Sequence, residues 1–223
     1  MAKVLLDYGH GGTDPGAVYN GLKEKDINFK IGQRVKSHLE RHGVEVIESR
    51  YGDTNPPLTE RSNKANVNNV IASISFHCNA SESHQAKGME TYTYGRGINE
   101  IKLANCVHYE IIRAGLYNID RGIKQANLHM VREPAMAAIL IELGFIDNIE
   151  DANLLKNKSE EFSLEIAKGI LKYLNIPFIE EGKNTDIFYR VIVGSYKDKN
   201  NAELQQKKLK EVGFDSFLEV YKK

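Results

Sequence analysis

The feature that most restricts the fold of this chain is an alternation between short apolar runs and longer segments with helical periodicity. Apolar runs of this length, bounded by turn residues, predict buried β-strands. They lie at residues 3–8, 44–48, 70–77, 89–94 and 138–142. The helical segments lie at residues 24–42, 58–69, 101–114 and 159–174. Because strands that alternate with helices pair mostly in parallel, we expect an α/β fold with a mostly parallel twisted sheet flanked by helices.

The helical pattern is clearest in residues 24–42. Four apolar side chains recur at every fourth residue and fall on one side of the helix: Ile27, Ile31, Val35 and Leu39. Gly43 is a typical helix stop. The last of these helices ends at Leu174, and Ser159 is its expected N-cap.

Composition restricts the class of protein and its surroundings. A chain of 223 residues holds one substantial domain and something small, and its net charge of zero argues against a dedicated nucleic-acid binder. Two cysteines form no disulfide framework, which favours a reducing, cytoplasmic origin. No segment resembles a signal peptide, and no apolar run is long enough for membrane insertion.

The last fifth of the chain departs from the main pattern. Residues 176–187 read as a polar linker, and residues 188–223 read as a small β-α-β unit with strands at 188–196 and 216–221 around a helix at 201–212. A unit of this size is too small to bury a stable core alone. We therefore expect a main domain at 1–175, a linker at 176–187 and a half-domain at 188–223.

Four residues that suit metal binding or proton transfer lie at the ends of predicted elements. His10 follows the first strand in a glycine turn, Glu24 begins the first helix, His77 ends the third strand and Glu142 ends the last. Open α/β sheets bind their ligands at such strand ends. Two histidines and one glutamate would leave the fourth tetrahedral position of a zinc ion for water, and Glu142 would then be free to move protons.

Each of these residues also has a structural interpretation. A lone histidine after a glycine turn is more often not a ligand, and Glu142 could pair with Arg121 or Arg132. Cys78, next to His77, could suggest a thiol nucleophile, but neighbouring strand residues point to opposite faces. The residues by themselves leave the choice between a zinc site and structural roles open.

Further polar side chains are candidates for the same cleft. Asn79 lies two residues after His77 and shares its face if the strand continues. His129 precedes the strand of Glu142 and is a candidate to line the cleft. The other histidines lie on predicted helices or polar loops and are expected to be solvated: His38, His42, His84 and His108.

Six short motifs in fixed order carry a resemblance to a known family. They are DYGHGGTDPGA at 7–17, EKD at 24–26, LTER at 58–61, SFHCNA at 75–80, DRGI at 120–123 and IELGFIDN at 141–148. Together they resemble the zinc-dependent N-acetylmuramoyl-L-alanine amidases of bacterial cell-wall hydrolysis, the amidase-3 family, over residues 3–174.

This resemblance implies a role for each matching residue. His10, Glu24 and His77 match the family's zinc ligands, and Glu142 matches its catalytic glutamate. The expected reaction is hydrolysis of the amide between N-acetylmuramic acid and L-alanine in peptidoglycan, with Zn²⁺ as cofactor. Arg121 is expected either to orient the substrate or to form a structural ion pair. The alternative is a non-catalytic peptidoglycan-binding protein on the same fold, and a closer rival is another zinc amide hydrolase that cuts within the stem peptide.

The tail resembles one repeat of a SPOR-type peptidoglycan-binding domain, which usually has two. We expect it either to bind the wall, to pair with a second copy in a homodimer, or to be a remnant. A wall hydrolase made in the cytoplasm without a signal peptide would reach its substrate after lysis or membrane permeabilisation, as an endolysin or a mother-cell autolysin does.

Overall fold

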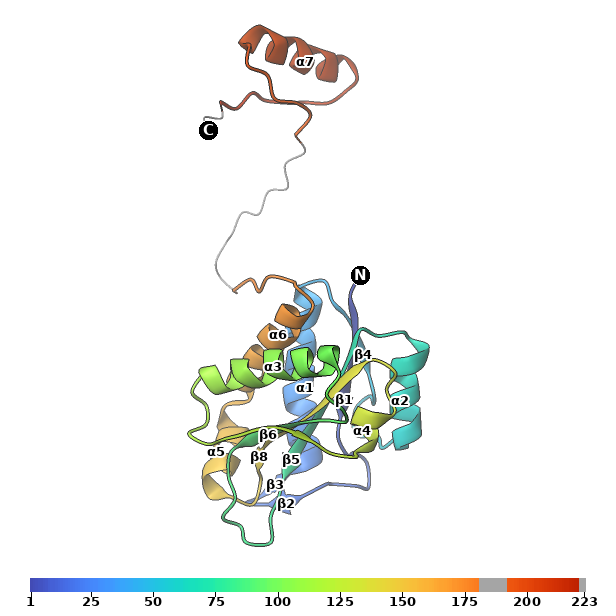
Figure 1. The fold of residues 1–223 in the computed structure, drawn as a ribbon, viewed down its shortest axis with the longest axis vertical. Coiled ribbons are helices and arrows are strands. Elements are labelled where there is room, and N and C mark those ends of the chain that lie inside the picture. Colours follow the sequence, from blue (N-terminus) through green and yellow to red (C-terminus); the bar gives the residue numbers. More distant parts are fainter. Residues whose placement is uncertain (181–191, 221–223) are drawn as a thin grey trace. The chain divides into compact units, whose positions relative to one another are not determined.

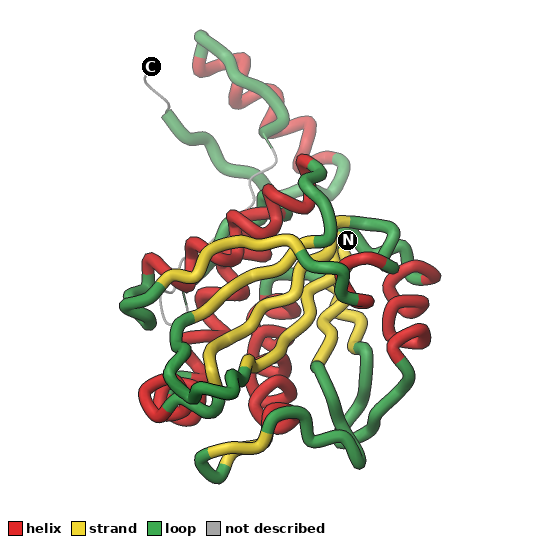
Figure 2. The backbone as a smooth tube through the Cα atoms, turned by 60° about the horizontal axis from the view of Figure 1, so that its bottom comes forward, coloured by secondary structure: helices red, strands yellow, loops and turns green. Residues whose placement is uncertain are grey.

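The computed structural model describes residues 1–180 and 192–220, which form two compact units, Met1–Ile179 and Glu180–Lys223. The first unit is built on a six-stranded sheet of order β4-β1-β5-β8-β6-β7 (Figure 2). Its strands are β1 (Lys3–Tyr8), β4 (Glu45–Glu48), β5 (Ala72–Asn79), β6 (Met89–Thr93), β7 (Asp120–Gln125) and β8 (Ala137–Phe145). All neighbouring pairs are parallel except β6 with β8, so the predicted fold class is confirmed.

Helices cover both faces of this sheet, as the alternation predicts. The larger core lies beneath α1 (Glu24–Arg41), α3 (Ile98–Arg113), α5 (Ile149–Asn157) and α6 (Ser159–Tyr173), and it includes Val4, Leu6 and Tyr8 of β1. The intervening Leu5 packs on the other face, against Ala65 of α2 (Leu58–Val67) and Met130 of α4 (His129–Arg132). Figure 1 shows α2 and α4 beside one another on that side. This split follows from the two-residue repeat of a strand.

Most predicted elements are confirmed to within a few residues, and the misses have physical reasons. Strand β7 was not predicted because its sequence, DRGIKQ, has one large apolar residue and lies at the sheet edge. The short α4 and α5 and the hairpin of β2 (Val18–Tyr19) and β3 (Leu22–Lys23) were also missed. Ser159 is not the N-cap of α6 but its first residue, and Asn148 instead caps α5 by accepting hydrogen bonds from two backbone N–H groups.

The second unit contains the predicted helix, α7 (Lys199–Glu211), which the Asp198 side chain caps by accepting the N–H of Asn200. The two predicted tail strands are not seen where the chain is described, because residues 192–196 and 216–220 form no strand. Residues 188–191 and 221 of those predictions lie outside the described residues. A strand needs a neighbour for its hydrogen bonds, and a single repeat supplies few.

Within the described residues, no helix is both long and apolar enough to span a lipid bilayer.

Candidate metal centre

His10, Glu24 and His77 meet at the carboxyl ends of β1 and β5. His10 Nε2 lies 3.1 Å from Glu24 Oε1, and His77 Nδ1 lies 2.8 Å from the same oxygen. One ligand atom from each residue falls within 4.8 Å of the others. Ligands at the ~2.0–2.1 Å distances of a tetrahedral zinc ion lie about 3.3 Å apart, so small side-chain adjustments would accommodate the ion.

The turn after β1 brings His10 to the site through close backbone packing. A Cβ at Gly9 would lie 2.4 Å from His77 Cε1, so only glycine lets the turn approach that ring. Gly16 combines a φ of +65° with a Cβ position 2.5 Å from Glu24 Oε2. The free imidazole nitrogen of His10, Nδ1, lies 2.8 Å from Asp14 Oδ2, which orients the ring as carboxylates do behind metal-bound histidines.

Glu24 is the first residue of α1, and its carboxylate is almost completely buried. Its Oε1 accepts the backbone N–H of Cys78 at 3.0 Å, and its Oε2 accepts that of Ala17 at 2.9 Å. Although burial opposes it, hydrogen bonds from the two histidines hold the pKa of Glu24 well below its usual range. The carboxylate is therefore an anion held in place by the backbone of two different segments.

Arg61 of α2 anchors the same turn from the other face of the sheet. This buried guanidinium donates to Asp7 Oδ1 at 3.0 Å, to the carbonyl of Tyr8 at 2.7 Å and to that of His10 at 2.9 Å. Ser75 donates a further hydrogen bond to Asp7. The arginine and aspartate of two predicted motifs thus hold His10 by its main chain.

The electrostatics of the three candidate ligand residues favour a cation. The hydrogen bond with the Glu24 carboxylate raises the pKa of His10 to about 9. Although burial opposes it, the same carboxylate raises the pKa of His77. The site draws positive charge to itself, and two imidazole nitrogens with one carboxylate oxygen are a donor set that suits zinc. The residues present therefore fit the metal that the resemblance implies.

Glu142 lies on β8 directly opposite His77 of β5, so the two side chains share one face of the sheet. Within the described part of the chain its Oε2 is buried and has no hydrogen-bond partner. Burial raises the pKa of Glu142 to about 7. The alternative of an ion pair with arginine is wrong, because Arg121 pairs with Glu90 and Arg132 pairs with Glu133.

The remaining candidates fall into two groups. Asn79 and Arg121 both bind the carboxylate of Glu90, at 2.8 Å each, next to Glu142. His129 instead faces α2, where its Nε2 lies 3.1 Å from the hydroxyl of Ser62. Glu90 was missed by the sequence analysis, although a charged residue in the apolar strand 89–94 is a usable signal.

Two expectations about other residues can be tested directly. Cys78 is buried in the larger core, and burial raises the pKa of its thiol, so the argument from the sequence against a thiol nucleophile is confirmed. His108 was expected to be solvated, but it is completely buried between Thr91 and Asp120, at 3.0 Å and 2.8 Å. His108 lies on the side of its helix that faces the sheet. The pattern of apolar residues did not reveal this, because polar and apolar residues are mixed in that segment.

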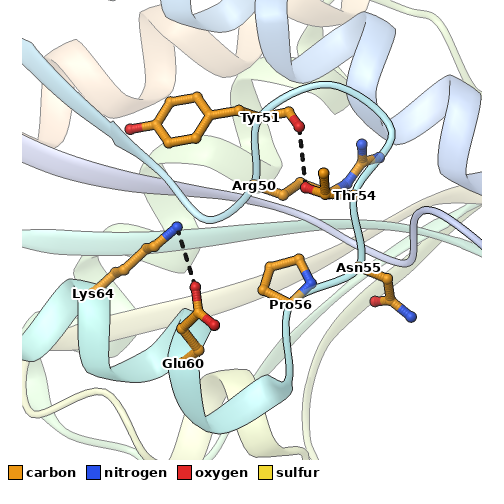
Figure 3. A pocket seen from close by; sticks show the side chains of 7 residues that line it. All are labelled: Arg50, Tyr51, Thr54, Asn55, Pro56, Glu60 and Lys64. Carbon is orange, nitrogen blue, oxygen red and sulfur yellow. Dashed lines mark hydrogen bonds and ion pairs between the residues drawn. The ribbon is translucent and has the colours of Figure 1, made fainter.

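An open pocket of about 360 Å³ lies between the loop after β4 and α2 (Figure 3). Tyr51, Thr54 and Lys64 are among its lining residues, and none of the four catalytic candidates lines it. The carbonyl of Thr54 lies 2.1 Å from the Cβ position of Gly11, so this loop packs against the turn of His10. The clearest role of this loop is to support the turn that carries His10.

Comparison with known proteins gives consistent matches. The family model described as N-acetylmuramoyl-L-alanine amidase matches residues 4–172, and the SPOR domain model matches residues 166–218. A sporulation-specific N-acetylmuramoyl-L-alanine amidase of Bacillus subtilis is 37% identical over 98% of this chain and 84% of its own length. An endolysin of Bacillus phage SPP1 is 39% identical over 79% of this chain and 68% of its own.

A solved structure supports the same relationship. The catalytic domain of the N-acetylmuramoyl-L-alanine amidase CwlV from Bacillus (Paenibacillus) polymyxa var. colistinus superposes with a TM-score of 0.75 at 32% identity, and the match covers 79% of this chain and 100% of that one.

Proposed function

Because the chain belongs to the N-acetylmuramoyl-L-alanine amidase family, we propose that it hydrolyses the amide bond between N-acetylmuramic acid and L-alanine in peptidoglycan. The observation that carries the proposal is the convergence of His10, Glu24 and His77 beside Glu142, whose buried Oε2 has no hydrogen-bond partner among the described residues. A wall-binding protein without activity would have no use for this arrangement.

We assign the ligand and acid–base roles from the donor set. His10 Nε2, His77 Nδ1 and a Glu24 oxygen would hold the metal, with Asp14 behind His10. A zinc ion held by these residues would supply Lewis acidity, which would polarise the amide carbonyl and make a water molecule more acidic. The two backbone N–H groups on Glu24 keep its carboxylate aimed at the site when charge changes during the reaction.

Glu142 would carry the proton. It takes a proton from the attacking water, whose oxygen bonds to the carbonyl carbon, and it returns the proton to the L-alanine nitrogen as the C–N bond breaks. A carboxyl group with a pKa near neutrality suits both steps, since it can hold or release the proton at little cost. Its in-register position opposite His77, one of the candidate ligands, supports this role.

The first test is to incubate the purified protein with peptidoglycan, with and without a chelator, and to identify the new ends by mass spectrometry. We expect free L-alanine amino termini on intact glycan strands, lost on chelation and restored by zinc. New termini within the stem peptide would instead identify the rival zinc peptidase. Absence of cleavage with every divalent metal would favour the wall-binding alternative.

We further propose that the tail engages a second copy of the chain. The SPOR match supports wall binding, but α7 buries no residue, and the flanking apolar side chains Ile192, Val193 and Val220 are exposed. Pairing two β-α-β units would supply the neighbouring strands that a single one lacks. Residues 1–175 then form the catalytic domain and 188–223 the tail, joined by 176–187.

Light scattering on the full chain and on a variant ending at Ile179 tests this pairing. We expect a concentration-dependent dimer for the full chain and a monomer for the shorter one. Pull-down of both proteins with peptidoglycan separates wall binding from dimerisation, because a monomeric full chain that still sediments with the wall would support wall binding alone.

The place of action follows from the substrate. The relatives include both a sporulation amidase and a phage endolysin, whose substrate is the cell wall. We propose that this protein reaches the wall after lysis or membrane permeabilisation. Immunoblots of culture medium before and after lysis would test that order.

A further inference from the structure

Four polar positions form a continuous row across the sheet, one on each of four neighbouring strands. His77 of β5 pairs with Glu142 of β8, and Glu142 pairs with Glu90 of β6. Arg121 of β7 follows, since its Nε donates to Glu90 Oε2 at 2.8 Å. Directly paired residues share one face of a sheet, so the row leads from the metal centre, past Glu142, to the sheet edge.

A β-bulge in β7 aims two cations at this row. Met89 pairs with Asp120 and Thr91 with Ile123, so Arg121 and Gly122 together oppose the single residue Glu90. In a regular strand Arg121 and Lys124 would point to opposite faces, because they are three positions apart. The extra residue of the bulge restores Lys124 to the face of Glu90, with which it forms an ion pair.

The bulge is held by residues of the DRGI motif and by a buried histidine. The Asp120 carboxylate accepts the N–H of Gly122 at 2.7 Å, and Gly122 has a φ of +79°, which favours glycine. The same carboxylate oxygen lies 2.8 Å from Nε2 of the fully buried His108. The chain thus devotes three residues to a local distortion whose clearest effect is the aim of Arg121 and Lys124.

The charge balance at the end of the row is positive. Glu90 is buried, and although burial opposes it, hydrogen bonds with Lys124, Tyr92 and Arg121 lower its pKa, so it is an anion. Arg121 and Lys124 together carry two positive charges and the Glu90 carboxylate carries one negative charge, so one positive charge remains. The Arg121 guanidinium is held by Nε and lies 4.8 Å from the centre of the Phe145 ring, while its two terminal nitrogens have no hydrogen-bond partner among the described residues. Its side chain remains 32% exposed.

We propose that Arg121 and Lys124 form a subsite for a carboxylate on the peptide side of the scissile bond, namely the free α-carboxylate of the D-glutamate that follows L-alanine. This inference rests on the proposed function. Two free guanidinium nitrogens match the two oxygens of a carboxylate. Glu90 lies two strands from His77, a distance of about 10 Å across the sheet. A two-residue peptide spans about 7 Å, and the length of an arginine side chain can cover the remaining distance. Amidation of that carboxylate removes the charge that the subsite recognises.

The test compares two muropeptides that differ only in this group, with D-glutamate either free or amidated at its α-carboxyl. The zinc-loaded full chain is assayed on both, and the ratio of the two kcat/KM values is measured. We expect a preference of roughly 10- to 100-fold for the free acid, the range of a charged hydrogen bond. Arg121→Gln should bring the ratio close to one, and Arg121→Lys should restore part of it.

Arg113→Gln is the matched control, because Arg113 is an exposed arginine on α3 that pairs with Glu110. It should keep the ratio of the parent protein. Since each ratio is internal to one variant, partial misfolding cancels from it.

Each of the following outcomes would contradict the proposed subsite. Equal cleavage of both substrates by the parent protein would overturn it and leave the amidase function intact. An Arg121→Gln variant that slows both reactions alike and keeps the ratio would assign Arg121 to the oxyanion or to the fold instead. Failure to cleave either muropeptide or intact peptidoglycan would overturn the proposed function, and this inference with it.

Discussion

Two paired glutamates on neighbouring strands differ in charge because their surroundings differ. Glu90 is bound by two cations and a tyrosine hydroxyl, which lower its pKa although burial opposes them. Glu142, directly opposite, has no such partner for Oε2 in the described residues, and burial raises its pKa to about 7. Such divergence between close carboxyl groups is how active sites separate fixed charges from proton carriers.

Glu142→Gln should separate catalysis from metal binding. We expect kcat to fall by roughly 10²–10⁴-fold, because the amide can neither take nor return the proton. Zinc content, measured by mass spectrometry of the purified protein, should stay at that of the parent, since Glu142 is not one of the three ligand residues. Substantial remaining activity would show that another group carries the proton.

The same variant should change how stability depends on pH in the metal-free protein. Between about pH 4.5 and 7 the folded state holds a proton on Glu142 that the unfolded state has lost, so stability falls as pH rises through this window. The shift corresponds to a loss on the order of 3 kcal/mol, which Glu142→Gln removes. Denaturant unfolding at pH 4.5 and 8 measures it, with the exposed Glu150→Gln as the control. An equal pH response in all three proteins would contradict the raised pKa.

At the scale of elements, two local features position different groups: the turn between β1 and α1, and the bulge in β7. The turn holds a candidate ligand residue, His10, with a φ of +63°, against the end of β5. The bulge puts two cations, Arg121 and Lys124, on the same face of the sheet without adding an element. Both devices use glycine, for close approach at Gly9 and for positive φ at Gly122.

Gly9→Ala tests the close approach. Its new Cβ would lie 2.4 Å from His77 Cε1 and 2.7 Å from the carbonyl oxygen of Phe76, so the ring or the turn must move. We expect zinc affinity to fall roughly 10- to 100-fold, as for other losses of support around metal ligands. Gly97→Ala is the control, because its Cβ would meet nothing closer than 3.5 Å. Titration calorimetry with zinc distinguishes the two, and equal affinities would remove the packing argument.

At the scale of the whole molecule, the metal centre joins segments that are far apart in the sequence. The turn after β1, α1 and β5 each contribute one candidate ligand residue, and α2 holds the turn in place through Arg61. Binding a metal ion there should therefore stabilise the whole amidase unit and not one loop.

That stabilisation should grow with pH. In the metal-free protein the hydrogen bond with Glu24 raises the pKa of His10 to about 9, so its stabilising effect is complete below about pH 6.5 and is lost as pH rises to 9. Zinc must displace the same proton, so it binds more strongly over this range. The difference in Tm between zinc-loaded and chelator-treated protein should widen from pH 6.5 to 9. A constant or narrowing difference would show that His10 is not a ligand.

The sequence by itself determined the alternation of strands and helices, the parallel sheet and the motif positions of His10, Glu24, His77 and Glu142. These follow from local apolar periodicity and from short motifs, which a single chain displays directly. Strand order, the antiparallel β6–β8 pair and the edge strand β7 came only from the tertiary structure, because they depend on pairing between distant segments.

Dependence on distant segments also explains the other features that the sequence did not predict. The burial of His108 and the bulge at Arg121 depend on contacts between α3, β6 and β7 that no local pattern encodes. The role of Glu90 depends on four side chains from three strands: Asn79, Tyr92, Arg121 and Lys124. Local sequence indicated the residues to which we assign the chemistry, whereas long-range pairing decided which charges face them.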